Sequence, residues 1–236
     1  MSSPLSSEAL FHLGPVPITE AVVATWGIMT VLVAGSILIT RHLTLVPSST
    51  QATFELIADT VDSQIRETMQ VEPAAYRSFI GTLFAFIFVA NWCTLVPGVE
   101  PPTAQLETDA ALAVLVFLAV IWFGIRAGGM RGYLATFASP SPIMIPLNFI
   151  ESLTRSFSMF VRLFGNVMSG VFMVGIVLSL AGLLVPIPLM ALDLLTGAVQ
   201  AYIFAILAMV FIAGAVGEAH PLPKTPDANP DQRTSP

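Results

Sequence analysis

The sequence predicts an all-α membrane protein with five membrane-embedded helices and one amphipathic helix at the bilayer interface. Hydrophobic residues make up 55% of the 236 residues and charged residues only 10%, whereas soluble domains carry roughly 25% charged residues. The apolar residues also gather in long stretches that match or exceed the about 20 residues a membrane-spanning helix needs. A soluble globular domain is therefore excluded.

Three stretches have the length of a single membrane crossing, namely residues 18–40, 78–97 and 109–126. Between the first two, apolar residues recur at helical spacing across residues 50–69, with charged residues mostly between them. The apolar members are Phe54, Ile57, Val61, Ile65 and Met69. This pattern is typical of an amphipathic helix that lies in the bilayer interface.

Two longer apolar stretches follow, residues 147–181 and 187–217, with a turn at 182–188 between them. As helices they would measure very roughly 50 Å and 45 Å, against about 30 Å of hydrocarbon. We therefore expect a hairpin of two long helices that tilt steeply or extend past the bilayer. Residues 1–217 form a single membrane domain on this interpretation, and we expect the proline-rich tail, residues 218–236, to be disordered.

The basic residues predict the orientation, because cytoplasmic loops collect Lys and Arg. Seven of them fall on one side, in the loops after the first and third spans and in the tail: Arg41, Arg66, Arg77, Arg126, Arg131, Lys224 and Arg233. The N-terminus, the loop 97–108 and the turn 182–188 hold none, so we expect the N-terminus outside and the C-terminus in the cytoplasm. We expect no cleaved signal peptide, because no basic residue precedes Arg41.

The charge and the cysteine content exclude other classes of function. The net charge of −6 leaves no basic surface for a nucleic acid. Cys93, the single cysteine, has no partner at metal-ligand spacing, so we expect it to pack in the protein and expect no metal site.

Arg162 lies near the middle of the fourth apolar stretch, where an arginine costs at least about 2.5 to 3.5 kcal/mol and cannot lose its proton. Arg155 lies nearer the cytoplasmic end, four residues after Glu151, so we expect those two to pair. The only other acid in the last two stretches, Asp193, lies near the outer turn. A buried ion pair for Arg162 therefore stays only an alternative.

Small residues surround Arg162 on its helical face, and small residues allow another helix to come close. They are Ser158, Gly165, Ser169 and Gly170. Static helix packing would explain the small residues alone. Together with the arginine, they favour a partner protein whose helix brings a carboxylate to that charge.

Polar residues of the last two stretches form three levels. Asn148 and Glu151 lie toward the cytoplasm, Arg162 and Asn166 lie midway, and Asp193, Thr196 and Gln200 run inward from the outer side. Two aqueous pockets with a fixed cation between them would form two half-channels that cannot join, so ions would cross on the partner's carboxylate. Ordinary interhelical hydrogen bonding is the alternative for Asn166 and Gln200. In a symmetric hairpin Arg162 would face residues near Leu207, about two helical turns from Gln200.

The run SMFVRLFGNVMSG at 158–170, with QAYIF at 200–204 and PLNFIE ending at Glu151, resembles subunit a of the membrane sector of F-type ATP synthases. The loop PPTAQLETDAAL, residues 101–112, is similar to the family's loop as well. The N-terminal segment SPLSSEALFHLGPVPIT also resembles the N-type subgroup, for which sodium transport has been proposed.

The resemblance implies a stator beside a rotating c-ring of small hairpin subunits, each with a membrane carboxylate. Arg162 would be the essential arginine that favours the ionised carboxylate and blocks leakage between the half-channels. Asn166 and Gln200 match polar positions near it, Glu151 matches the acid of the cytoplasmic pathway, and Asp193 matches an ionisable position on the outer pathway.

The implied partners are the c-ring, b-type subunits of the peripheral stalk and the rest of an ATP synthase in a bacterial inner membrane. The chain has no phosphate-binding loop, so nucleotide chemistry would occur elsewhere in the complex, and we expect no cofactor here. The coupled ion, proton or sodium, stays open.

Two departures from relatives matter. Val171 is apolar where relatives often carry a second ionisable group, so the outer pathway would be arranged differently or rely more on water. Arg155 precedes Ser156 where relatives commonly have Lys-Pro, so we expect an uninterrupted helix. The rival hypothesis is a self-contained ion channel or secondary transporter in which Arg162 binds an anion, although the inverted repeats and midplane helix breaks of transporters are not visible.

Overall fold

In the residues that the structure describes, five apolar helical segments are long enough to cross a membrane, and the second of them, Arg77–Leu95, includes the 3₁₀ turn that follows its α-helix. The computed structural model describes residues 9–13, 16–41, 49–95, 101–137, 143–181 and 185–219. The five helices are α1 (Glu20–Thr40), α3 (Arg77–Trp92), α4 (Leu106–Phe137), α5 (Met144–Ala181) and α6 (Pro186–Ala219). The predicted all-α membrane fold is therefore confirmed.

Shorter elements complete the fold. They are the antiparallel hairpin of β1 (Ala9–Leu13) and β2 (Val16–Thr19), the helix α2 (Ser49–Met69), and three single-turn 3₁₀ helices, η1 (Pro73–Ala75), η2 (Cys93–Leu95) and η3 (Pro102–Ala104). The sequence did not predict the hairpin. The predicted disordered tail lies outside the described residues from residue 220 onward, and α6 itself continues to Ala219.

The amphipathic segment forms α2, and polar contacts hold it against α3 and α6. Arg77 at the start of α3 donates a hydrogen bond from Nε to Oδ1 of the buried Asp62, 2.5 Å away. The Tyr202 hydroxyl of α6 donates to Oε1 of Gln64 at 2.9 Å. In the first half of α2 the large apolar side chains are exposed, as an interfacial position requires: Phe54, Leu56 and Ile57.

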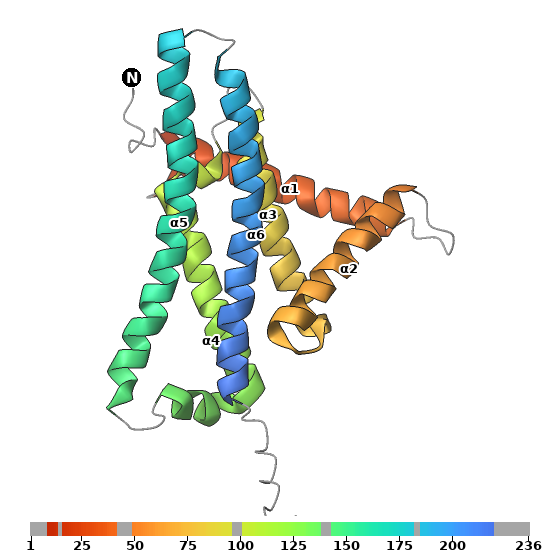
Figure 1. Ribbon diagram of the computed structural model, residues 1–236, viewed down its shortest axis with the longest axis vertical. Coiled ribbons are helices and arrows are strands. Elements are labelled where there is room, and N and C mark those ends of the chain that lie inside the picture. The colour runs from red at the N-terminus through yellow and green to blue at the C-terminus, as the bar shows by residue number, and fades with distance from the viewer. Residues whose placement is uncertain are drawn as a thin grey trace, which may run out of the picture.

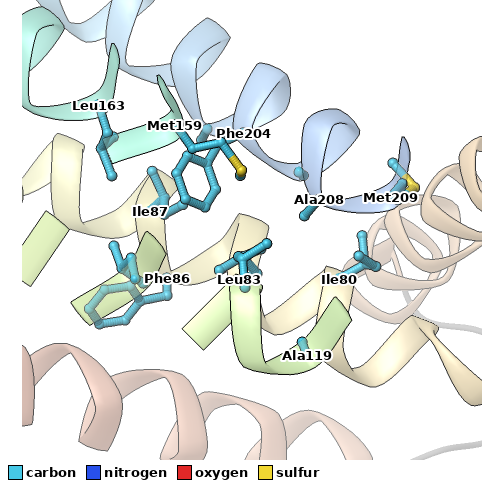
Figure 2. Packing of buried hydrophobic residues seen from close by; sticks show 14 of the residues in the cluster. Ile80, Leu83, Phe86, Ile87, Ala119, Met159, Leu163, Phe204, Ala208 and Met209 are labelled. Carbon is cyan, nitrogen blue, oxygen red and sulfur yellow. The ribbon is translucent and has the colours of Figure 1, made fainter. Parts of the chain in front are cut away.

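The hydrophobic core lies where α3, α4, α5 and α6 meet (Figure 2). Ile87 of α3, Leu163 of α5 and Ala208 of α6 are completely buried there. Alanines of α6 recur at helical spacing on its buried side, at positions 201, 205 and 208. Because small side chains let neighbouring backbones approach closely, α6 becomes the central helix and contacts α2, α3, α4 and α5.

The helices α5 and α6 lie side by side and antiparallel along the long axis of the molecule (Figure 1). The shorter helix α1 runs across their direction in the same view. Its 21 residues span about 31 Å, close to the hydrocarbon thickness. If α1 crosses the bilayer, the two long helices are therefore steeply tilted, as their lengths predict.

A sharp bend in α4 occurs at Gly129, beyond the predicted span 109–126. Its φ of 70° and ψ of 167° belong to a backbone region that only glycine occupies easily. After the bend, Tyr133 folds back so closely on Gly124 that a side chain at 124 would meet its ring at 2.6 Å. The bend therefore depends on two glycines, one for its backbone angle and one for its packing.

Replacing Gly129 by Ala is expected to lower the free energy of unfolding by about 1 to 3 kcal/mol, because a Cβ strains this conformation. The matched control is Gly132→Ala, where a new Cβ meets no atom within 4 Å and φ is ordinary. Thermal unfolding of the purified protein in detergent measures both. Equal midpoints for the two variants would contradict the proposed strain.

Candidate functional site

The helix α5 has one face toward the bundle and one open face. Met159, Leu163 and Val167 are buried against the other helices. Arg162 is exposed on the open face. Three of the four small residues predicted around it are exposed there as well: Ser158, Gly165 and Ser169. Arg162 is the midpoint of α5, and it forms no ion pair with any residue that the structure describes. Its charge is accessible to another molecule.

An open groove of about 530 Å³ adjoins Arg162 on the side toward the start of α5. The helix α5 contributes polar and charged side chains as well as apolar ones, whereas α6 contributes only apolar side chains. The lining residues are Leu147, Ile150, Glu151, Thr154, Arg155, Ser158, Met159 and Arg162 of α5, and Leu207 and Phe211 of α6. The predicted pair of Arg155 and Glu151 is confirmed as an ion pair within this groove. The groove therefore joins the acid of the predicted cytoplasmic level to the central arginine.

Two contacts set the register of α5 against α6. The carboxylate of Asp193 occupies the space that a side chain at Gly170 would need. Toward the other end, the guanidinium carbon of Arg155 lies 5.6 Å from the centre of the Phe211 ring. Each contact joins one residue of α5 to one of α6, so facing residues can be counted from both.

Counting inward from these contacts places the backbone of Arg162 level with residues 201–204 of α6. Helical side chains lean toward the N-terminus of their own helix, so the guanidinium reaches further along α6, to Leu207. The predicted juxtaposition with Leu207 is thus present in the groove. The backbone separation from Gln200 is smaller than the symmetric hairpin predicts.

Polar residues of the predicted outer level occupy different environments. Asp193 is half-buried against α5, and Gln200 is buried, seven residues later on the same side of α6. The Nε2 atom of Gln200 has no hydrogen-bond partner in the described part of the chain. The exposed Thr196 instead donates its hydroxyl hydrogen bond to the backbone oxygen of Asp193 at 2.9 Å. The side chains of Asp193 and Gln200 thus lie on the same side of α6, whereas Thr196 is exposed and bonds to the backbone of its own helix.

The remaining predicted polar residues lie on α5. Asn166 is half-buried one turn beyond Arg162, at the boundary between the open face and the bundle. Asn148 is half-buried near the start of the helix, one turn before Glu151. Val171 is exposed beside Gly170. Because its side chain is apolar, it adds no polar group at the level of Asp193.

Sequence reasoning missed Asn91, which joins three elements inside the bundle. Its Nδ2 donates to the backbone oxygen of Gly197 in α6 at 2.9 Å, and its Oδ1 accepts from the Thr103 hydroxyl of η3 at 2.7 Å. All of these groups are buried. A lone amide inside the apolar stretch 78–97 was the signal that could have found it.

Comparison with known proteins gives a consistent family assignment. A family model described as the ATP synthase A chain matches residues 22–213. ATP synthase subunit a 2 of Bradyrhizobium sp. strain BTAi1 is 53% identical over 216 residues, which cover 92% of this chain and 97% of that protein. ATP synthase subunit a of Albidiferax ferrireducens is 46% identical over 213 residues, 89% of this chain and 92% of that protein. ATP synthase subunit a 1 of Hahella chejuensis is 40% identical over 225 residues, 95% and 96% of the two chains.

Replacing Gly197 by Ala is expected to cost about 1 to 3 kcal/mol of stability, because the new Cβ would lie 2.9 Å from Cβ of Asn91 and force α3 and α6 apart. Gly214→Ala is the matched control on the same helix, since its Cβ meets nothing within 4 Å. The measurement is the unfolding midpoint of each purified variant. A midpoint for Gly197→Ala equal to that of the control would show that this close approach is not needed.

Proposed function

The chain belongs to the ATP synthase A chain family, and on that premise we propose that it is the ion-translocating stator, which carries ions through two offset half-channels to a rotating c-ring. It is a multi-pass membrane subunit of an ATP synthase. We further propose a bacterial inner membrane location, with the N-terminus outside, the C-terminus in the cytoplasm, and b-type stalk subunits as additional partners.

Arg162 is the single observation that carries this proposal. It combines a permanent charge, a position at the midpoint of a membrane helix, and exposure on a face of small residues. A ring carboxylate about 4 Å from the guanidinium gains about 4 kcal/mol when ionised, at an effective dielectric constant of 20. That gain favours ion release from the ring only at the level of Arg162.

The two half-channels are proposed to approach Arg162 from opposite ends of the hairpin. The groove that contains Glu151, Thr154 and Ser158 supplies the cytoplasmic route. Asp193 and Gln200 supply the outer route on α6. Because the fixed arginine separates the two, an ion passes between them only on the ring, and each charge that crosses gains about 2.3 kcal/mol per 100 mV.

The coupled ion is decided by ATP-driven uptake into vesicles that contain the reconstituted complex, with sodium titrated from nominal absence. Sodium uptake that persists with a protonophore would assign sodium transport. Acidification that needs no sodium and collapses with the protonophore would assign proton transport.

Arg162→Ala is expected to lower coupled ATP synthesis by about 10²-fold or more while the complex still assembles, because the ring carboxylate loses its fixed counter-charge. Arg131→Gln is the matched control, since it removes an exposed arginine that lies outside the groove. Synthesis is measured in vesicles under an imposed ion gradient. Retained synthesis in Arg162→Ala would contradict the proposed function.

A further inference from the structure

Asp109, in the first turn of α4, is a buried acid to which neither the fold nor the proposed function assigns a role. Its exposed fraction is 0%, and neither carboxylate oxygen has a hydrogen-bond partner in the part of the chain that the structure describes. A carboxylate buried without partners is unstable in apolar surroundings. The side chain is therefore suited to hold a proton on oxygen rather than a bare negative charge.

Buried hydrogen bonds connect η3, the element just before Asp109, to the first part of α6. The preceding element η3 packs against α3, α4 and α5, and its buried Thr103 donates to Asn91. Asn91 in turn donates to the backbone oxygen of Gly197, one turn after Asp193. Figure 1 shows the start of α4 in the same half of the bundle as the start of α6.

The sequence independently places the same groups on one side of the membrane. The loop 97–108 and the turn 182–188 both lack Lys and Arg, so both are predicted to lie outside. Asp109 directly follows that loop, and Asp193 closely follows that turn. Two acids are thus predicted at the outer end, one half-buried on α6 and one buried on α4.

We propose that Asp109 is a second ion-exchanging acid of the outer half-channel, acting before Asp193; this rests on the proposed function. As a carboxylate it takes up the transported cation from outer water, and it returns to the carboxylate when the cation passes to the Asp193 carboxylate. For a proton, the O–H bond at Asp109 breaks as one forms at Asp193, directly or through water. The transfer conserves charge, since Asp109 becomes a carboxylate as Asp193 becomes neutral, and it changes no oxidation state.

The first test measures passive ion flux through the complete membrane sector in vesicles, with protons and sodium followed separately. Asp109→Asn, which keeps the shape of the side chain but removes the ionisable group, is expected to lower flux of the coupled ion by about tenfold or more. Asp109→Glu restores the carboxyl group and is expected to recover part of the flux. Glu107→Gln is the matched control, because Glu107 is an exposed acid of the same first turn.

Unchanged flux in Asp109→Asn would overturn the proposal. Arg162→Ala, assayed in the same vesicles, separates that failure from failure of the proposed function. If Asp109→Asn keeps its flux while Arg162→Ala loses coupling, only the role of Asp109 is rejected.

A second test covers the case in which Asp109→Asn does not assemble. Since Cys93 is the only cysteine, Ala113→Cys in a Cys93→Ala background has one thiol, placed one helical turn after an intact Asp109. Silver ions added from the outer side are expected to block flux in this variant and to leave the Cys93→Ala parent unaffected. Insensitivity to silver would overturn the proposal. Loss of assembly in both Asp109→Asn and Asp109→Glu would also overturn it, because Asp109 would then have a purely structural role.

Discussion

A permanent positive charge at the midpoint of a membrane helix is the constraint on which the rest of the structure depends. The guanidinium of Arg162 keeps its proton, so its cost in hydrocarbon, at least about 2.5 kcal/mol, has to be offset by an opposite charge or by water. The described part of the chain supplies no acid for it, although Glu151 and Arg155 pair two turns away. The open face of α5 follows from this, because a counter-charge from outside the chain needs access.

Close packing on the other face of α5 allows that open face to exist. A helix that exposes one full side needs strong support from the opposite side, and Leu163 of α5, packed in the core that includes Phe204 of α6, supplies it (Figure 2). The alanines of α6 bring four neighbouring helices close to that helix. Gly170 and Gly197 then admit the side chains of Asp193 and Asn91 where any larger residue would collide with them. The side chains of Asp193 and Asn91 thus enter the bundle at positions where a glycine leaves space.

Local patterns in the sequence predicted most of the fold and part of the site. Hydropathy predicted the five membrane helices, and the four-residue spacing of Glu151 and Arg155 predicted their ion pair. Both signals depend on neighbours along a single helix. The bend at Gly129 was missed, because the pair Gly128 and Gly129 beyond the predicted span indicates the end of a helix, whereas α4 continues through it to Phe137.

Contacts between distant segments could not be predicted in this way. Asn91 and Gly197 are more than one hundred residues apart, and nothing in either local pattern indicates the other. The burial of Asp109 was missed for the same reason, since an acid in a first helical turn ordinarily lies at the surface and interacts with the helix dipole. The hairpin register was only approximate, because symmetry about the turn assumes that facing residues lie equally far from its centre, whereas the contacts of Gly170 with Asp193 and of Arg155 with Phe211 offset the two helices by several residues.

The distribution of acids about Arg162 explains how the proposed stator could give direction to ion movement. A ring carboxylate in lipid is stable only when it is neutral, so the ring can turn through lipid only with its ions bound. Beside Arg162 the ionised form is favoured instead, so an ion leaves there and another has to bind before that carboxylate returns to lipid. Because Glu151 lies toward one end of the hairpin and Asp193 toward the other, release and binding occur on opposite sides of the membrane. The membrane potential then favours binding from one side and release to the other. The ring turns in one direction because the charge of Arg162 stays fixed between the two.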